Sequence, residues 1–458
     1  MHRIKLLLLC ILGVALWGCD RTRPDTPTGS DTQVGESSVV EVKKDGGGKW
    51  KLIVNGKSYY VNGAATNRFY SDVHRFGGNT IRLYSTKTGD TKTILKEAAE
   101  NGLMVYLGLG MTAAKSMDYS DAGKVAAQKE TLLSYVKQYM NFPALLCWSL
   151  GNEIEASHEN DINLFKAIGD LAAAIKELDP HHPVTCALAS SAVTRIKNLA
   201  TYAPAVDFVS VNSYYPNVGS IAKNIASAGV QLPYMVTEFG PRGTWAMSPE
   251  PGRILPWPDN YSASSKALVE ETSSEKEDRY LQVWQNDIKA HESDGCLGSF
   301  VFVWGYQTHG EVLNWYAAFT TDHYSYGVCD AMQKCWTGSY PAVRAPRIES
   351  RNDVTLNGKV AEAAVKVAPG SKNTASVKAV ISSGTQVRYQ WVLFKEGSSS
   401  PDGSMPDGFQ YKALFDKSDA AEVSFTAPTE TGGYRLYIFV KDDANKKAAS
   451  ACIPFCVE

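Results

Sequence analysis

The chain has 458 residues and a formal net charge of −2, from 46 basic and 48 acidic residues. The charges are mixed along the sequence without basic blocks, which argues against a nucleic acid or an anionic membrane surface as partner. Beyond the N-terminus, no run approaches the roughly 18 apolar residues that a membrane-spanning helix needs.

The first 19 residues are interpreted as an export signal. Arg3 and Lys5 precede an apolar segment, residues 6–16, that is too short to span a bilayer. The segment leads into "LWGC", which resembles a bacterial lipobox although Trp17 is bulky for that motif. The resemblance implies lipidation of Cys19 and an exported lipoprotein on the cell surface, the outer membrane or the periplasmic face. An ordinary cleaved signal with an incidental cysteine is the alternative.

Residues 20–38 consist of Asp, Thr, Pro, Ser and Gly with hardly an apolar side chain. Such a composition cannot form a core, so it predicts a flexible tether between the anchor and the folded part. The remaining chain is long enough for two or three domains.

Residues 39–63 alternate between apolar and polar side chains, with turn signals at Asp45-Gly46 and Asn55-Gly56, and predict an N-terminal β-hairpin. From about residue 59, eight short apolar runs follow, from "YYVNGAA" to "GSFVFVWG", separated by helical stretches. Both faces of these runs are apolar, as in parallel strands covered by helices. We therefore assign residues 39–345 to a (β/α)8 TIM barrel with its hairpin, with a doubly wound open sheet as the alternative.

Residues 346–458 have no helical periodicity. Short alternating strands are separated by Gly, Ser, Pro and Asp clusters, a pattern that is typical of an antiparallel β-sandwich of the immunoglobulin-like type. Trp391 fits a core aromatic residue of this domain.

Several other kinds of site find no support in the sequence. The cysteines after Cys19 show neither zinc nor thioredoxin spacing, and we interpret them as structural thiols. No histidine pair or carboxylate cluster suggests a metal, and no cofactor is predicted. The segment "GLGMTA" at residues 108–113 imitates a dinucleotide-binding fingerprint, but it begins on the third strand and lacks the later acidic strand end.

The carboxyl ends of barrel strands share one mouth, so the last residues of each run are the candidate site. They form a set of an arginine, two amides, two glutamates and several aromatic residues: Arg82, Tyr84, Asn152, Glu153, Asn212, Tyr214, Tyr215, Glu238, Trp304 and, just beyond, His309. A single glutamate after a strand is usually a rim residue or a helix cap, and Glu155, Glu159 and Asp161 are interpreted in that way. Glu153 and Glu238 at the ends of two strands together indicate a catalytic site more specifically than either glutamate alone.

"WSLGNE" on strand four and "TEFG" on strand seven resemble the clan-A glycoside hydrolases, especially those with the family 2 type of barrel. The resemblance covers residue 59 to about residue 340. It implies that Glu153 is the acid/base and Glu238 the nucleophile of a retaining reaction. The short hairpin, barrel and C-terminal sandwich are similar in arrangement to the endo-β-1,3-glucanases of glycoside hydrolase family 158.

The same resemblance assigns roles to residues around the glutamates. It implies that Asn152 bonds the sugar 2-hydroxyl, that Arg82 lies near the nucleophile and that Tyr214 hydrogen-bonds it. Trp304 would form the floor of the −1 subsite, which holds the sugar whose bond is cleaved, and His309 would join the substrate-binding residues.

Physical chemistry supports these roles independently. Retaining hydrolysis needs one protonated and one ionised carboxyl group about 5–5.5 Å apart. Arg82 and a tyrosine hydroxyl beside Glu238 would favour its charged form, and a second nearby carboxylate would raise the proton affinity of Glu153.

The long loop after strand seven and loops elsewhere carry aromatic residues that could stack on sugars or only pack against the barrel: Trp245, Trp257, Tyr261, Tyr119, Trp315 and Tyr316. We count Trp245 among the substrate-binding residues.

Together these features predict a monomeric, membrane-anchored retaining glycoside hydrolase that acts on a polysaccharide or oligosaccharide. The first candidate substrate is β-1,3-glucan, which the enzyme would cleave within the chain. The alternatives are a surface glycan-binding protein on a hydrolase fold, a transglycosylase, or a hydrolase of another β-glycan such as β-mannan or β-galactan.

Overall fold

The computed structural model describes residues 36–66, 68–86, 90–247, 254–255, 268–306, 314–396 and 408–458. The predicted signal peptide with Cys19 and most of the predicted tether lie outside these residues, as do Trp257, Tyr261 and His309. Within the described ranges, no helix is both long and apolar enough to cross a membrane.

The predicted hairpin is one part of a three-stranded antiparallel sheet: β1 (Val40–Lys44), β2 (Trp50–Val54) and β3 (Lys57–Tyr59). Asn55 and Gly56 turn between β2 and β3 with φ of 50° and 79°, as a tight hairpin turn requires. Val40 and Leu52 share an apolar cluster with residues near the starts of barrel strands, including Leu146 and Phe208. The sheet therefore covers the amino-terminal end of the barrel and leaves the opposite end for a site.

A buried serine, histidine and aspartate anchor the chain where it enters this sheet. Ser38 Oγ lies 2.9 Å from His182 Nε2, and His182 Nδ1 lies 2.8 Å from Asp179 Oδ2. All three side chains are at most 3% exposed. A substrate cannot reach them, so this trio is structural in spite of its likeness to a hydrolase triad.

Eight parallel strands close the barrel in the order β10-β11-β4-β5-β6-β7-β8-β9. They are β4 (Val61–Ala65), β5 (Thr80–Leu83), β6 (Met104–Gly108), β7 (Leu145–Asn152), β8 (Val184–Leu188), β9 (Val209–Asn212), β10 (Tyr234–Phe239) and β11 (Cys296–Val301). The pairing of β11 with β4 completes the circle. This confirms the predicted barrel and excludes the open sheet.

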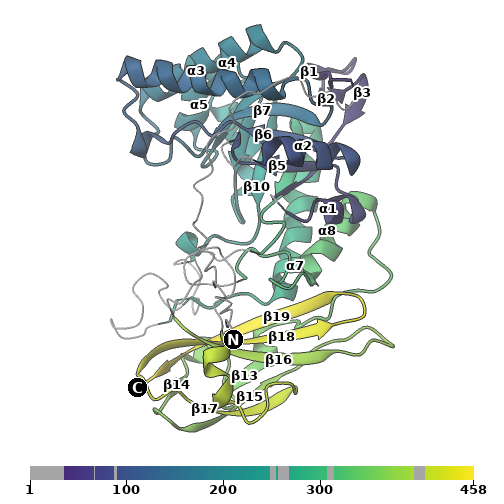
Figure 1. The fold of residues 1–458 in the computed structure, drawn as a ribbon, viewed down its shortest axis with the longest axis vertical. Helices are drawn as coiled ribbons and strands as arrows, with labels where there is room; N and C mark the ends of the chain where they lie inside the picture. The colour runs from purple at the N-terminus through teal and green to yellow at the C-terminus, as the bar shows by residue number, and fades with distance from the viewer. Residues whose placement is uncertain are drawn as a thin grey trace, which may run out of the picture.

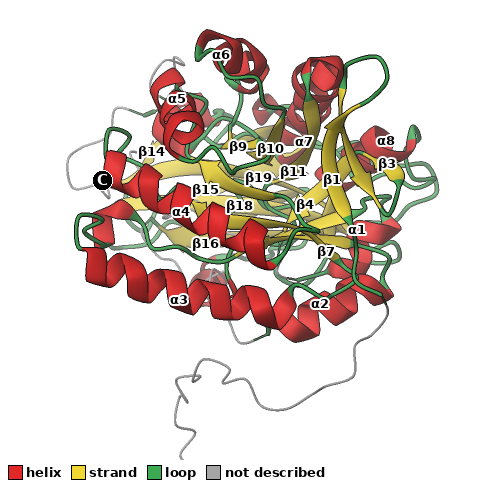
Figure 2. Cartoon of the chain, turned by 90° about the horizontal axis from the view of Figure 1, so that it is seen from above, coloured by secondary structure: helices red, strands yellow, loops and turns green. Residues whose placement is uncertain are grey.

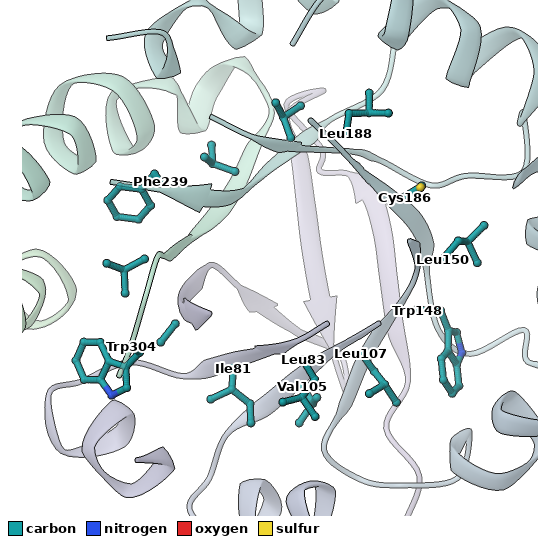
Figure 3. Close-up of a cluster of buried hydrophobic side chains, with 14 of the residues drawn as sticks. Ile81, Leu83, Val105, Leu107, Trp148, Leu150, Cys186, Leu188, Phe239 and Trp304 are labelled. Carbon is teal, nitrogen blue, oxygen red and sulfur yellow. The ribbon is translucent and has the colours of Figure 1, made fainter. Parts of the chain in front are cut away.

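Helices on the outside of the barrel cover its strands (Figures 1 and 2). They are α1 (Tyr70–Arg75), α2 (Thr91–Glu100), α3 (Ala122–Tyr139), α4 (Ile162–Leu178), α5 (Val193–Tyr202), α6 (Ile221–Ser227), α7 (Ser273–Val283) and α8 (Gly327–Thr337). A π-turn (Trp284–Ile288) and a 3₁₀ helix (Lys289–Asp294) extend α7, and shorter 3₁₀ turns occur at Ala114–Ser116, Val218–Ser220, Thr244–Ala246, Arg351–Asp353, Ala361–Ala363 and Gly408–Leu414. Figure 3 shows alternate strand residues, such as Ile81, Leu107 and Leu188, pointing outward into the apolar layer between strands and helices.

Two further sheets build the C-terminal sandwich. One contains β12 (Ser325–Tyr326), β14 (Lys366–Val367), β16 (Arg388–Lys395), β18 (Gly432–Asp442) and β19 (Lys447–Val457). The other contains β13 (Val354–Leu356), β15 (Lys372–Val377) and β17 (Glu422–Thr426). The sheets are mainly antiparallel, as predicted, and Trp391 lies in the core between them. Two short strands, β12 and β14, pair parallel to β19, and β12 comes from the chain before α8.

The sandwich lies directly against the barrel (Figure 1). Tyr437 donates a hydrogen bond to Glu270 (3.0 Å), just before α7, and Thr272 donates to the carbonyl of Ile348 (2.7 Å). Lys447 on β19 forms a buried ion pair with Asp330 on α8. The two parts are therefore joined by buried polar contacts.

All seven cysteines of the described chain are buried free thiols, which confirms their structural interpretation. They are Cys147, Cys186, Cys296, Cys329, Cys335, Cys452 and Cys456.

Candidate active site

Three donors surround the carboxylate of Glu238, the penultimate residue of β10. Arg82 Nη1 lies 3.0 Å from Glu238 Oε1, and the Tyr84 hydroxyl donates to the same oxygen at 2.9 Å. The Tyr214 hydroxyl donates to Oε2 at 2.5 Å. Glu238 is only 5% exposed, so these contacts act with little solvent screening. A full positive charge and two hydroxyl donors together stabilise the ionised carboxylate.

The two tyrosines remain protonated donors. Burial, and next the negative charge of Glu238, raise the pKa of both Tyr84 and Tyr214 well above the ordinary value. Each hydroxyl therefore donates to Glu238 and does not compete with it for a proton.

Glu153 has the opposite environment. Burial, and next the charge of Glu238, raise the pKa of the Glu153 carboxyl above its ordinary value. Its one hydrogen bond with a neighbouring side chain comes from Asn212 Nδ2, at 2.8 Å from Oε1. Its backbone is in the left-handed region with φ of 52°, which is uncommon for a residue with a side chain. The chain thus turns sharply after β7 at the residue that carries the acid.

Asn152, Asn212 and Arg82 connect the two carboxyl groups. Asn152 Oδ1 accepts from Arg82 Nη2 at 2.6 Å and from Asn212 Nδ2 at 3.0 Å. Both bonds use the oxygen of Asn152, and its amide nitrogen has no partner in the described part of the chain. Asn152 therefore keeps a donor for a ligand hydroxyl.

Arg82 is 1% exposed and holds several groups at once. Besides Glu238 and Asn152, it donates to the carbonyl of Thr237 at 2.6 Å and to Asn212 Oδ1 at 3.2 Å. Its guanidinium lies 4.4 Å from the ring centre of Tyr84. Such a buried cation with fixed partners positions the ends of β5, β7, β9 and β10 relative to one another.

The structure brings together Glu153, Glu238, Asn152, Arg82 and Tyr214 from the predicted set. Trp245 joins them at the edge, because its ring meets that of Tyr214 edge-on at 5.5 Å while its side chain stays 63% exposed. His309 lies outside the described residues.

The predicted role of Trp304 is corrected. Its side chain is fully buried and packs against Phe76, Phe319 and Trp336, in the layer between strands and helices (Figure 3). The chain leaves β11 at Val301, and beyond a strand end the alternation of faces no longer predicts where a side chain points. Phe302 lies on the site side instead, with its ring 5.9 Å from that of Tyr214.

Three other aromatic residues pack against the protein and are not free to stack on sugars. Tyr119, Trp315 and Tyr316 are each at most 5% exposed. Tyr119 donates to the carbonyl of Thr112, and Trp315 donates through its indole nitrogen to the carbonyl of Arg242 at 2.9 Å. Of these loop aromatics in the described ranges, Trp245 is the exposed one.

The acidic residues after β7 divide into two kinds. Asp161 accepts from the backbone amides of Asn163 and Leu164 and caps α4, as predicted. Glu155 is not a rim residue: it is fully buried, accepts from the Ala189 amide at 2.7 Å and lies 3.5 Å from Arg195. Its role is to tie the β7 loop to the end of β8.

Sequence reasoning placed Tyr84 and Asn212 among the strand-end candidates but gave them no role, and it missed Phe302. Tyr84 lies directly after β5, two positions beyond Arg82, and its side chain continues the inward face of the strand. Asn212 is aligned with Glu238 in the pairing of β9 with β10, which the sequence alone does not give.

No cluster of histidine, cysteine and carboxylate side chains that could hold a metal ion occurs among the described residues. The arrangement joins two carboxyl groups through Asn212 and Arg82, one with a raised pKa and one with three hydrogen-bond donors.

Comparison with known proteins agrees with this geometry. Residues 91–264 match the family model described as glycosyl hydrolases family 2, TIM barrel domain. The matched segment contains both glutamates, so this part of the barrel is similar to the TIM barrel domain of family 2 glycosyl hydrolases. No functionally curated protein matches the sequence.

Solved structures are similar to the chain at low identity and with TM-scores below 0.5. A family 2 β-galacturonidase from Eisenbergiella tayi, bound to galacturonate, is 14% identical with a TM-score of 0.47. A Bifidobacterium dentium β-glucuronidase is 15% identical with a TM-score of 0.47, and a family 5 mannosidase from Rhizomucor miehei is 12% identical with a TM-score of 0.46. The β-galacturonidase match covers 66% of this chain and 55% of that one, and the β-glucuronidase match covers 66% and 50%. The mannosidase match covers 65% of this chain and 97% of that one. The chain thus spans about half the length of the β-galacturonidase and of the β-glucuronidase.

Proposed function

We propose that the protein is a retaining glycoside hydrolase of a β-linked glucan, endo-acting on β-1,3-glucan. The observation that carries the reaction type is the contrast between the two glutamates. Glu238 receives hydrogen bonds from Arg82, Tyr84 and Tyr214, whereas burial and the neighbouring charge raise the pKa of Glu153. Two carboxyl groups with opposed proton affinities are what double displacement requires.

In the first step, a carboxylate oxygen of Glu238 attacks the anomeric carbon while the bond to the leaving oxygen breaks. Glu153 donates its proton to that oxygen, so the leaving sugar departs as a neutral alcohol. The step ends with a glycosyl ester on Glu238 and an ionised Glu153. Asn152 would donate from its free amide nitrogen to the sugar 2-hydroxyl, a bond that strengthens as the ring flattens.

In the second step, Glu153 takes a proton from a water molecule, and the water oxygen attacks the anomeric carbon. The ester bond breaks and returns the electron pair to Glu238, which Arg82 and the two tyrosines stabilise again. Two inversions at the same carbon give a product with the original β configuration.

The substrate assignment has a separate basis. The order of short N-terminal sheet, barrel and sandwich is similar to that of family 158 endo-β-1,3-glucanases. Trp245, exposed beside Tyr214, offers a stacking surface for a sugar next to the site. The substrate test also includes glycosides of the kinds on which the solved structures above act by name, namely galacturonides, glucuronides and mannosides.

We also propose that a lipid on Cys19 anchors the protein to a membrane after export. The basis is the basic start, the short apolar segment and the "LWGC" motif. Labelling of expressing cells with a radioactive fatty acid should mark the wild type and not Cys19→Ala, and the variant should leave the membrane fraction. Equal labelling of both would contradict the anchor.

The reaction and substrate can be tested together with the purified protein. The panel contains β-1,3-, mixed-linkage and β-1,4-glucans, β-mannan, xylan, galactan and aryl β-glucuronides and β-galacturonides. We expect release of a ladder of oligosaccharides from β-1,3-glucan with the β anomer formed first, and no release by Glu238→Gln or Glu153→Gln. A matched control, Glu159→Gln, changes a glutamate that pairs with Arg195 outside the carboxyl pair and should keep activity.

Other outcomes of this panel point elsewhere. Products longer than the substrate would identify a transglycosylase. Binding to one glycan without turnover of any would favour a surface glycan-binding protein. Wild-type turnover by either catalytic variant on a true substrate would overturn the mechanism.

A further inference from the structure

A cavity lies away from the two glutamates, at the junction of barrel and sandwich. Its volume is about 830 Å³. The barrel contributes Thr320, Thr321 and Asp322 from the connection between β11 and α8, and the sandwich contributes strand β16 and segment 412–419. The connections that follow barrel strands lie at the catalytic end of the barrel. The junction cavity is thus formed at the same end of the molecule as the carboxyl pair.

The floor of the junction cavity is polar and ordered. Lys441 is 5% exposed, and its Nζ lies 3.1 and 2.9 Å from the two oxygens of Asp322 and 3.0 Å from Gln390 Oε1. Gln390 accepts through its oxygen, and its amide nitrogen has no partner among the residues that the structure describes. The floor therefore offers an amide donor and carboxylate acceptors held in place by a buried ammonium group.

The charges of the junction cavity are largely paired. Lys441 is neutralised by Asp322, and Arg388 at the rim bonds both oxygens of Asp443 at 3.0 and 2.9 Å. A site for phosphate or sulfate would present cations directed at the ligand. Paired charges, amides and hydroxyls suit a neutral ligand that is rich in hydroxyl groups.

Aromatic rings supply the apolar part of the wall. Tyr389 and Phe415 are half-buried and pack against the sandwich core, whereas Trp391 is 3% exposed and donates to the carbonyl of Ala420. These rings lie on the opposite face of β16 from Gln390, so the cavity wraps around this edge strand, with polar groups on one face and rings on the other. Mostly apolar walls with a few fixed polar groups are typical of small-ligand sites, and the C–H faces of sugars pack well on aromatic rings.

We propose that the junction cavity is a saccharide-binding site, separate from the carboxyl pair, that holds a segment of a neutral polysaccharide without cleaving it. The identity of the polymer as the substrate of the barrel rests on the function proposed above. A peptide strand added to the edge of β16 fits less well, because the Trp391 amide already donates to the Ser418 carbonyl at 2.9 Å and interrupts that edge.

Two variants of the full chain test the junction cavity. Thr321→Trp places a large ring into the cavity from an exposed rim position, and Gln390→Ala removes the free amide donor. The matched controls are Thr374→Trp on β15 and Gln386→Ala before β16, which are exposed and do not line the cavity. Circular dichroism checks that each variant is folded, and Gln390→Ala remains informative if Thr321→Trp is not.

Binding is measured by calorimetry with each soluble glycan of the panel, in a Glu238→Gln background that prevents consumption of the polymer. For the bound polymer we expect Kd to rise about fivefold or more in both cavity variants and to stay unchanged in both controls, which corresponds to about 1 kcal/mol or more. With the active enzyme, hydrolysis of a short oligosaccharide should be unaffected while KM for the polymer rises.

The outcomes separate this inference from the proposed function. Hydrolysis of a glycan with unchanged Kd in the cavity variants would overturn the junction site and leave the enzyme assignment standing. Glycan binding that is lost in Thr321→Trp, without turnover of any substrate, would support the site and reject the enzyme. Binding of an extended peptide in place of every glycan, sensitive to Thr321→Trp, would replace the saccharide by a peptide.

Discussion

Two carboxyl groups of the same kind acquire opposite properties from side chains on neighbouring strands. Glu238 receives hydrogen bonds from Arg82, Tyr84 and Tyr214, and Glu153 receives one from Asn212. The difference arises at strand ends that adjoin only when the barrel closes. Burial and the charge of Glu238 raise the pKa of Glu153, and the contribution of each contact to this asymmetry can be measured separately.

The tyrosine contacts of Glu238 give the first prediction. Tyr214→Phe and Tyr84→Phe each remove one hydroxyl donor to the buried carboxylate without opening a large space. Because the carboxylate is regenerated as a leaving group, kcat/KM should fall about 10- to 100-fold in each, from the loss of a hydrogen bond to a charged group. Steady-state kinetics on the true substrate measures the effect.

Tyr119→Phe is the matched control. Its hydroxyl donates to the backbone carbonyl of Thr112 and does not bond Glu238, so kcat/KM should change less than about threefold even if stability falls by about 1 kcal/mol. Equal losses of activity in Tyr119→Phe and Tyr214→Phe would mean that the tyrosines act through the fold alone.

The raised pKa of Glu153 gives a second prediction. Only the protonated form donates to the leaving oxygen, so kcat/KM should decline as pH rises through this pKa, which burial and Glu238 place above the ordinary glutamate value. A dinitrophenyl β-glycoside needs no proton for its leaving group. With that substrate, Glu153→Gln should retain the first step, seen as a burst of dinitrophenol, and its rate should show no alkaline decline.

The rate of the dinitrophenol burst is measured as a function of pH for the wild type and for Glu153→Gln. If the activity of Glu153→Gln declined at high pH in the same way as that of the wild type, the decline would belong to another group. Glu153 would then not be the acid.

How far single residues could be predicted depended on where they lie relative to a strand. Arg82, Asn152 and Glu238 sit within strands, where alternation decides which face a side chain occupies. Trp304 lies three residues beyond β11, and its expected place beside the sugar is taken by Phe302. The burial of Glu155 was not predictable either, because its partner Arg195 lies on α5, far along the chain.

At the scale of elements, the catalytic loop after β7 is fixed at both ends. Glu153 turns the chain out of the strand, Glu155 bonds the amide of Ala189, and Asp161 begins α4. The loop is therefore held by polar contacts over a few residues, with Glu153 at its start.

The cap of α4 gives a third prediction. Asp161→Ala leaves the amides of Asn163 and Leu164 without their side-chain acceptor, and the free energy of unfolding should fall by about 1 kcal/mol. Asp170→Ala, an exposed change within the same helix, should alter it by less than about 0.5 kcal/mol. Urea unfolding of the two variants makes the comparison, and kcat should be unchanged in both. Equal stability of the two variants would show that the cap is energetically irrelevant.

The strands of the barrel were predictable because each is an apolar run bounded by polar residues, and the helices because of their own periodicity. The pairings of the sandwich were not. Ser325–Tyr326 is too short to stand out as a strand, and it forms β12 only because β19 lies alongside it. A two-residue strand of this kind depends on tertiary contact, which local sequence does not encode.

At the scale of the molecule, a buried polar network crosses from sandwich to barrel. Tyr437 on β18 donates to Glu270, and Lys276 on α7 binds the same carboxylate at 2.5 Å. Lys276 also donates to the carbonyl of Asn314 at 2.8 Å, just before Trp315 and Tyr316, and the Tyr316 ring lies 5.4 Å from that of Tyr214. The sandwich thus supports the framework that holds Tyr214, a hydrogen-bond donor to Glu238, and we expect barrel and sandwich to unfold as one unit.

Tyr437→Phe tests this coupling. The change leaves an oxygen of the buried Glu270 without its hydroxyl donor, which should lower the free energy of unfolding by about 1–3 kcal/mol. Because the lost bond spans the junction, scanning calorimetry should show a single transition that moves to lower temperature as a whole. Tyr389→Phe, whose half-buried hydroxyl has no partner in the described chain, should move it far less. Two separate transitions, with only one displaced by Tyr437→Phe, would mean that the sandwich folds independently of the barrel and that the network adds no cooperativity.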